Sequence, residues 1–455
     1  MNKAAIFLAC TALTACATPH TAVEDLTLMP AAYDHAGDET GDAIEADWWR
    51  AFDEPALDSL IAEALAANQN ITAGLARLRQ ARASVRATNA TLFPTISGGA
   101  SASSSSQDDF DDISTSGRLS ASYQLDLFGQ NSAGRAAARA GYDAQVFTQK
   151  SLELTLQSDV AFNYFSILAL RERLQTARSN LDISERIFEI INVRYDAGDV
   201  SGFDVSSQEA ALANARARIP QLEQQLLSFE TALAILLGRT PQGYGAPAGN
   251  LLAMAPPSID PGLPSNLLLR RPDLLTAEAS LRAADANIAA AQRAFFPTID
   301  LSAGLSAAPL TGGASVIGSL ASSIAGPIFS GGRLEAGLES AEARADEQIA
   351  QYRQATLSAL RDVEVSLSGL MTSAQREIQL EAAYDAAERS LELSEVRYRT
   401  GADNLTSLLN AQSTFFNASD SLVQGRLDRL TAAVDLFVAL GGGWAPEADR
   451  LAATN

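Results

Sequence analysis

Lysine, cysteine and histidine are nearly missing from this sequence of 455 residues. Two cysteines and two histidines leave too few thiolates and imidazoles for a zinc fold or a disulfide scaffold. The net charge of −21 provides no basic excess, which argues against a nucleic-acid-binding protein. After the N-terminus, no run approaches the ~18 consecutive apolar residues of a membrane-spanning helix, so a helical transporter is excluded as well.

The N-terminus has the pattern of a lipoprotein signal. Lys3 is followed by an apolar stretch that is too short to span a bilayer. The stretch ends at Leu13-Thr14-Ala15-Cys16, which resembles the bacterial lipobox. We expect residues 1–15 to be removed and Cys16 to carry a covalent lipid, with no other cofactor. An ordinary signal peptide with a chance cysteine is the alternative.

An internal repeat runs through the rest of the chain. The sequence FPTI at 93–96 recurs at 296–299, and VRY at 193–195 recurs at 396–398, both at an offset of 203 residues. Shared offsets over such a distance indicate a duplicated unit. The expected divisions are a signal peptide at 1–15, an acylated tether at 16–47, a first repeat at 48–238, a proline-rich segment at 239–271, a second repeat at 272–441 and a tail at 442–455.

Each repeat begins with a helix and a β-hairpin. Amphipathic helices are expected at 57–88 and 272–293, each ending before its Phe-Pro pair. Alternation of apolar and polar residues predicts the strands that follow. These strands are expected at 95–105, 117–127, 299–305 and 315–325, with exposed loops at 107–116 and 307–314.

A very long helix follows each hairpin. Residues 130–197 and 332–400 contain no proline and would each form ~100 Å of helix at 1.5 Å per residue. Such a length favours coiled-coil packing over a globular core. Each stretch leads to a glycine suited to a helix C-cap, and returning helices are expected at 204–237 and 404–440, the first kinked at Pro220.

The four strands pose a geometric problem. A soluble hairpin with one buried face and a strand of an outer-membrane barrel share the same alternating pattern. If the strands enter a membrane, four of them cannot close a barrel, and an open edge cannot persist in lipid. Two copies would give eight strands with a filled interior, whereas three copies would give twelve and leave a passage.

Taken together, these motifs resemble a known family. The lipobox, the repeated FPTI, the VRY-x-x-G turns and the closing ALGGGW at 439–444 are similar to those of TolC-like outer membrane factors, in the lipoprotein branch that serves multidrug and metal efflux. The resemblance implies a mainly α protein with a β-barrel: a homotrimeric channel-tunnel whose helical coiled-coil barrel continues a shared twelve-stranded barrel, four strands per chain. It also implies a periplasmic membrane-fusion adaptor and an inner-membrane resistance-nodulation-division transporter as partners.

The same resemblance implies two sets of functional residues. The turns would form the periplasmic tips that contact the adaptor, although helix caps with inward-packed tyrosines are the simpler interpretation. The tip residues are Arg194, Tyr195, Gly198, Arg397, Tyr398 and Gly401. The candidates for a periplasmic constriction are Asp199, Asp204, Asp403 and Asn410, the last at a position where relatives often carry aspartate.

The expected function is a passive exit duct, not an enzyme, in the outer membrane of a Gram-negative bacterium. It would be lipid-anchored and inserted through its strands, with the helical tunnel in the periplasm and no metal or nucleic acid bound. It would conduct drugs, metals or other small molecules. The alternatives are an outlet for type I protein secretion and a structural periplasmic coiled-coil lipoprotein without a pore.

Overall fold

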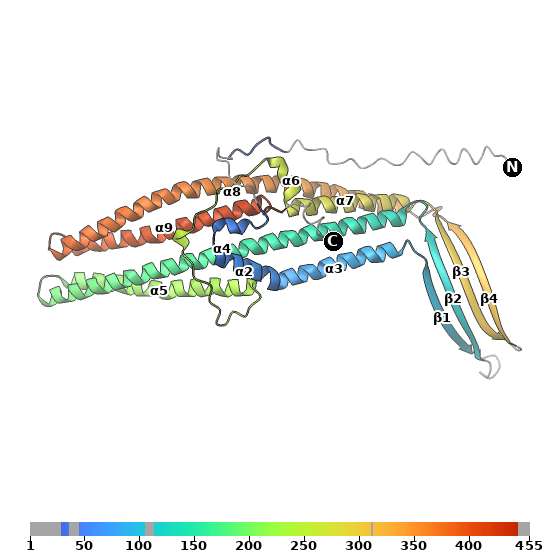
Figure 1. Cartoon of the computed structure of the whole chain (residues 1–455), viewed down its shortest axis with the longest axis horizontal. Coiled ribbons are helices and arrows are strands. Elements are labelled where there is room, and N and C mark those ends of the chain that lie inside the picture. Colours follow the sequence, from blue (N-terminus) through green and yellow to red (C-terminus); the bar gives the residue numbers. More distant parts are fainter. Residues whose placement is uncertain (1–28, 36–44, 105–112, 311–312, 445–455) are drawn as a thin grey trace. The chain divides into compact units, whose positions relative to one another are not determined.

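The computed structural model describes residues 29–35, 45–104, 113–310 and 313–444. Cys16, residues 1–15 and most of the expected tether and tail therefore lie outside the described residues. The elements run along the chain as η2 (Trp48–Phe52), α2 (Pro55–Ala67), α3 (Gln69–Ala90), β1 (Thr95–Ser104), β2 (Ile113–Leu125), α4 (Gln130–Asp196), α5 (Gly202–Leu236), η3 (Leu251–Ala253), η4 (Pro264–Asn266), α6 (Leu267–Arg270), α7 (Pro272–Arg293), β3 (Thr298–Leu310), β4 (Gly313–Ala325), α8 (Arg333–Arg399) and α9 (Leu405–Ala439) (Figure 1).

The long helices are confirmed. α4 and α8 each contain 67 residues, and each is followed by a helix of 35 residues. α7 has the predicted bounds, and α5 continues through Pro220. No helix among the described residues is long and apolar enough to cross a membrane.

One predicted helix is wrong. Residues 57–88 were expected to form a single helix, but the chain breaks at Asn68, whose backbone is extended with ψ of 131°. The Asn68 side chain accepts hydrogen bonds from the Asn70 and Ile71 backbone N–H groups at 2.8 and 3.2 Å, so it caps α3. Its Nδ2 also donates to the Leu236 carbonyl at 2.9 Å. Asparagine at an N-cap stabilises a helix start, which favours two helices over one.

The four strands form one antiparallel sheet in the order β1-β2-β3-β4. Both predicted loops are too long, because β2 already begins at Ile113 and β3 pairs with β4 as far as Leu310 and Gly313. Pro309, which has no N–H to donate, lies beyond the pairing of β3 with β2, which ends at Ala307.

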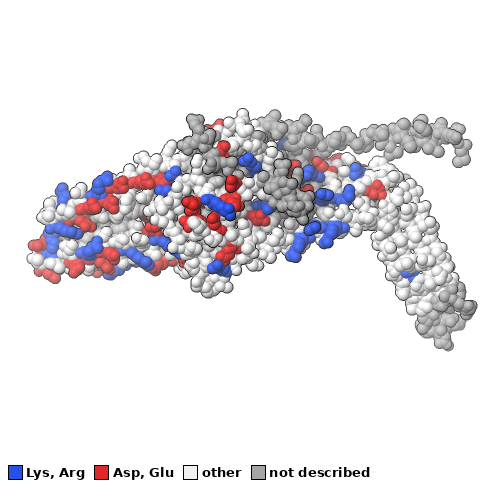
Figure 2. Space-filling view, viewed as in Figure 1, with Lys and Arg blue, Asp and Glu red and all other residues white. Residues whose placement is uncertain are grey.

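The two faces of the sheet differ in polarity. The register aligns Gly98, Leu119, Leu305 and Gly318 in one row, and successive residues along a strand alternate between faces. The first face carries exposed apolar side chains: Ile96, Leu119, Leu301, Leu305, Val316, Leu320 and Ile324. The second face is rich in serine, with Oγ–Oγ hydrogen bonds of 2.8 Å joining two serine pairs between β1 and β2, and Ile317 is its exception. Figure 2 shows few charged groups over the sheet and many over the helices.

The chain folds into two compact units, and each unit draws on both sequence repeats. One unit includes residues 79–145 and 276–355 and therefore the whole sheet. The other includes the described residues of 31–78, 146–275 and 356–455. The boundary between the two compact units therefore does not coincide with the boundary between the two sequence repeats.

An aromatic cluster forms the main core of the second unit. The Trp48 ring stacks on Phe437 with centroids 5.2 Å apart, and Phe52 lies 5.2 Å from Phe165. All four side chains are at most 4% exposed. Because large aromatic side chains bury the most apolar area, this cluster ties the segment that begins at Trp48 to α4 and α9.

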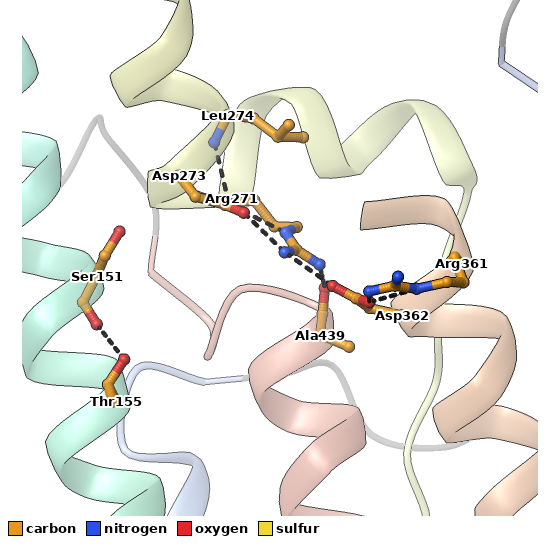
Figure 3. A network of polar contacts seen from close by, with 8 residues as sticks. All are labelled: Ser151, Thr155, Arg271, Asp273, Leu274, Arg361, Asp362 and Ala439. Atoms are coloured by element: carbon orange, nitrogen blue, oxygen red, sulfur yellow. Dashed lines mark hydrogen bonds and ion pairs between the residues drawn. The ribbon is translucent and has the colours of Figure 1, made fainter. Parts of the chain in front are cut away.

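A polar network fixes the start of α7 against α8 and α9 (Figure 3). Arg271 donates two hydrogen bonds to the Asp273 carboxylate at 3.0 and 2.7 Å and one to the Ala439 carbonyl at 3.1 Å. Its third partner is Asp362, at 3.4 Å. Gly441 then passes so close that a Cβ there would lie 2.7 Å from the Arg270 carbonyl, which accounts for the glycine run after α9.

Part of the expected tether contacts α8. Tyr33 is only 5% exposed, the Asp34 N–H donates to the Glu364 carboxylate at 2.7 Å, and His35 Nδ1 lies 2.8 Å from the other Glu364 oxygen. Burial alone would raise the pKa of Glu364. The hydrogen bonds from His35 and Asp34 outweigh it, so the pKa is lowered.

This contact gives a first testable expectation. A carboxylate whose pKa is lower in the folded than in the unfolded state stabilises the folded state at pH values above its unfolded pKa. This stabilisation disappears as the pH falls through the folded pKa. We expect Glu364→Gln to lower the hydrogen-exchange protection factor of the Asp34 amide at neutral pH, and acidification to lower that protection factor in the unmodified protein, each relative to an unprotected amide at the same pH. Glu339→Gln, an exposed change on the same helix, is the control. Equal protection of Asp34 in both variants would contradict the expectation.

Candidate functional site: the paired helix turns

The α4–α5 and α8–α9 turns have the same backbone geometry. Gly198 and Gly401 adopt left-handed conformations with φ of +82° and +72°. The Asp199 N–H donates to the Arg194 carbonyl, and the Ala402 N–H donates to the Arg397 carbonyl, both at 2.8 Å. These are the bonds of a Schellman C-cap, in which a residue with positive φ closes the helix end. The predicted glycine caps are therefore present in both turns.

The returning helices are capped differently. At the start of α5, Ser201 and Asp204 form a capping box: the Asp204 carboxylate accepts from the Ser201 N–H at 2.9 Å and from its hydroxyl at 2.8 Å. At the start of α9, the Asn404 side chain accepts from the Ser407 N–H at 2.9 Å. Each cap satisfies backbone donors that a helix start leaves unpaired.

The two turns contact each other through side chains. The Arg194 guanidinium lies 5.2 Å from the ring centroid of Tyr398, which is the geometry of a cation–π contact. Tyr398 is 3% exposed and packs in an apolar cluster with residues of α4, α8 and α9. Tyr195, at the equivalent position of the first turn, is 49% exposed. The alternative of an inward-packed tyrosine therefore holds for Tyr398 and not for Tyr195.

The turns also present apolar surface that the sequence analysis missed. Phe203, in the first turn of α5, is 75% exposed, and Val193 and Val396 are 65% and 59% exposed. A large apolar residue two positions after the capping Ser201 was the available sequence signal for Phe203. Arg397, which forms an ion pair with Asp403 at 3.2 Å, adds a charged group beside this surface.

The four constriction candidates fall into two groups. Hydrogen bonds from the Ser201 side chain and backbone lower the pKa of Asp204, and bonds from the Asn404 backbone and the Ser407 side chain lower that of Asp403. Both carboxylates are thus engaged within their own turns. Asp199 and Asn410 have exposed side chains.

The capping box gives a second testable expectation. Because the folded-state pKa of Asp204 is lowered, its contribution is present above the unfolded pKa of about 3.9 and is lost as the pH falls through the folded value. We expect Ser201→Ala to cost about 1 kcal/mol of local stability and to speed exchange of the amides in the first turn of α5. Asp204→Asn should remove the acid dependence of the protection factors of those amides, measured relative to an unprotected amide at the same pH. Glu209→Gln, a later exposed position on α5, should change neither.

A buried amide network joins three helices next to the turns. Gln412 Nε2 on α9 donates to Asn180 Oδ1 and Ser184 Oγ on α4, each at 2.8 Å. Gln208 Nε2 on α5 donates to the Ser184 carbonyl at 2.8 Å. Further along, Arg173 on α4 pairs with Asp420 on α9 at 2.6 Å. Buried polar groups cost free energy when unpaired, so these contacts fix how α4, α5 and α9 meet.

This region carries no recognisable reactive chemistry. A cavity of about 460 Å³ lies beside the amide network, lined mainly by Asn, Ser, Ala and Arg side chains of α4, α5 and α9. Within the described ranges, no group of three His, Cys, Asp or Glu residues could hold a metal ion. What the arrangement offers is a contact surface and a set of breakable links between helices.

This architecture and its sequence are similar to those of known proteins. The model of the family described as outer membrane efflux protein matches residues 60–239 and 263–442, two segments with the same offset of 203 residues as the sequence repeat. The chain is 34% identical over 470 residues to the pyoverdine export outer membrane protein OpmQ of Pseudomonas aeruginosa, covering 99% of both. It is 30% identical over 422 residues to the probable outer membrane lipoprotein SilC of Salmonella typhimurium, covering 88% of both.

The fold agrees with the sequence comparison. The structure matches that of the outer-membrane channel OprN with a TM-score of 0.84 and 28% identity, over 94% of this chain and 99% of that one. The family matches together span well over half of the chain, on the same hairpins and long helices described above. The chain therefore belongs to the outer membrane efflux protein family and is a TolC-like outer-membrane efflux channel.

Proposed function

We propose that this chain is the outer-membrane exit duct of a tripartite efflux pump. Three copies share one twelve-stranded barrel and lead small molecules passively from the periplasm to the exterior. A periplasmic membrane-fusion adaptor docks on the helix turns and connects them to an inner-membrane resistance-nodulation-division transporter. The observation that carries the proposal is the four-stranded sheet, with one apolar face, one serine-rich face and two unpaired edges.

The sheet supports a shared barrel. In the described chain, β1 and β4 are paired on one side only, and an unpaired backbone edge is costly in lipid. Pairing β4 of one copy with β1 of the next satisfies every edge when the ring closes. Twelve strands leave a lumen, which the serine face would line while the apolar face meets lipid.

The exposed apolar residues of the turns support adaptor docking. Val193, Tyr195, Phe203 and Val396 are large side chains exposed at the two turns, and aromatic residues flanked by arginine are typical interface anchors. Arg194 and Arg397 lie beside this surface. The buried Tyr398 ring supports this surface indirectly, because its cation–π contact positions the Arg194 side chain.

The constriction candidates and the amide network support gating at the same end. In a trimer, each of Asp199, Asp204, Asp403 and Asn410 would occur three times around the axis, so a carboxylate there produces a strong local field. Opening would separate α9 from α4, which breaks the bonds of Gln412 and the Arg173–Asp420 pair. Adaptor contacts would compensate for those losses.

The relatives support two finer points. The name of SilC describes a lipoprotein, which favours a covalent lipid at Cys16 in this chain. The name of OpmQ describes export of pyoverdine, which favours small molecules over proteins as cargo.

Purification in detergent followed by planar-bilayer recording tests the proposal. We expect a heat-labile trimer with a β-sheet signal and stepwise conductance. A monomeric product that gives no conductance would rule out the duct and favour a structural coiled-coil lipoprotein.

A further inference from the structure

An aromatic stack closes the junction between β2 and β3. The rings of Phe128 and Phe296 lie 5.0 Å apart between centroids and are inclined by only 14°. In the sheet register Leu125 is opposite Ile299. Phe128 lies three residues after Leu125, and Phe296 lies three residues before Ile299. The two rings therefore stand opposite each other where the ladder ends.

The internal repeat provides a second pair of the same kind. Phe93 is the counterpart of Phe296, since each begins an FPTI segment before a strand. Phe329 stands in a similar place after the second hairpin, at an offset of 201 residues from Phe128: each follows the second strand of its hairpin and precedes a glycine with positive φ, which is Gly129 directly after Phe128 and Gly331 two residues after Phe329.

The second pair has no contact within one chain. Phe93 is 68% exposed and Phe329 is 91% exposed, and neither ring meets another ring in the described part of the chain. Phe93 precedes β1 and Phe329 follows β4, the two outer strands of the sheet. Within a single chain, Phe128 and Phe296 therefore stack on each other, whereas Phe93 and Phe329 remain exposed to solvent.

We propose that Phe329 of each copy stacks on Phe93 of the partner subunit, so that the interface between copies repeats the Phe128–Phe296 junction. The proposal rests on the proposed trimer and specifies how its copies meet. It also fixes a strand register: β4 and β1 of the partner subunit pair so that Gly326 lies opposite Ile96 of the partner subunit.

The polarity of the sheet provides an independent check of that register. Continuing the ladder from Gly326 places Ile324 opposite Gly98 of the partner subunit, and both lie on the apolar face. Ser323 then lies opposite Gly99 of the partner subunit, on the serine-rich face. A register shifted by one residue would bring an apolar face next to a polar one. The aromatic pairing and the face polarity thus select compatible registers.

The stack would add specificity where strand pairing alone gives little. β1 is composed of Thr, Ile, Ser, Gly and Ala, and such small side chains specify register weakly. A stacked aromatic pair stabilises an interface beyond the effect of its buried area, and this extra stabilisation changes the association constant about two- to tenfold. Because a ring of three copies contains three such pairs, their combined effect on trimer dissociation should be several times larger on a logarithmic scale.

Cysteine cross-linking tests the contact. In the full-length protein, Phe93→Cys and Phe329→Cys are combined, and the purified trimer is oxidised with copper phenanthroline. Stacked side chains that extend from facing backbone segments bring their Cβ atoms near enough for a disulfide to form after small backbone movements. We expect covalent dimers and trimers on boiled, non-reducing gels that revert to monomer with dithiothreitol. The matched control combines Phe128→Cys with Phe296→Cys, which should oxidise within the chain and leave its mass unchanged.

The outcomes separate the contact from the trimer itself. A protein that elutes as a trimer but yields only monomer from the Phe93/Phe329 pair, while the Phe128/Phe296 pair oxidises, overturns the aromatic contact and leaves the duct intact. Equal cross-linking when Ile328→Cys replaces Phe329→Cys also overturns it. A protein that elutes as a monomer overturns the proposed trimer. As a second readout, Phe93→Ala and Phe329→Ala should lower the temperature of trimer dissociation non-additively, whereas fully additive losses contradict a direct contact.

Discussion

Replacing Gly198 and Gly401 together by valine is expected to abolish export while leaving the trimer intact. Both glycines have φ values of +72° or more, and an L-residue pays about 1–2 kcal/mol in that conformation, with more for a β-branched side chain. A Cβ at either position would meet nothing within 4 Å, so the effect arises from the backbone and not from a clash. The turns should therefore change shape without disturbing the packed helices behind them.

The expected loss is large because, in the proposed function, the two turns act as one docking surface. If the surface contributes interface hot spots of about 2 kcal/mol or more, its distortion weakens adaptor binding by about thirtyfold or more. The measurements are export from cells that depend on this channel and pull-down of the adaptor, with native gels to follow the trimer.

Asparagine at the same positions is the matched control. Asparagine tolerates the left-handed conformation far better than valine does, so Gly198→Asn with Gly401→Asn should keep most of the export. Normal export from the valine variant would contradict the assignment of the turns as the docking tips. A valine variant that no longer forms trimers would show that the turns contribute to assembly.

Sequence reasoning located the helices and strands because their signals are local. The absence of proline and the closing glycines set the bounds of α4 and α8 within one or two residues. The break at Asn68 was missed although its N-cap bonds to Asn70 and Ile71 are local, because an asparagine inside an otherwise helical pattern is a weak signal and its bond to Leu236 joins residues far apart in the sequence. The start of β2, the end of β3 and the start of β4 extend further than predicted, because pairing between neighbours carries the ladder into small residues with little strand preference of their own, whereas β1 and β2 end one and two residues earlier than predicted.

The candidate site was predicted in position but not in detail. The two turns share the letters VRY, yet Tyr398 is buried under Arg194 and Tyr195 is exposed. That difference arises from which helix covers each turn, and the repeat cannot specify it. The links of Gln412 to Asn180 and Ser184 escaped prediction for a similar reason, since a glutamine on a long helix resembles a solvated residue until its partners are known.

Removing the charge of Glu377 is expected to cause a large loss of stability in the second unit. The Glu377 carboxylate on α8 is 1% exposed as a residue and forms ion pairs with Arg426 and Arg429 on α9, the latter at 2.8 Å. Arg426 also donates to the Met254 carbonyl at 2.9 Å. Glu377→Ala would leave two guanidinium groups without their shared carboxylate, at a cost of about 3–5 kcal/mol.

The physical reason for that loss can be tested by comparing buried and exposed pairs. Asp428→Asn breaks a pair with Arg376 that joins the same two helices, but its side chains are 36% and 55% exposed, so the expected cost is below about 1 kcal/mol. Unfolding followed by the helix signal at neutral pH measures both. Replacing Glu377, Arg426 and Arg429 together by leucine and methionines should recover much of the loss, because no buried charge is then left unpaired and the other partner of Arg426, Glu381, is exposed to water. If the triple variant is as unstable as Glu377→Ala, lost packing and not an unpaired charge accounts for the effect.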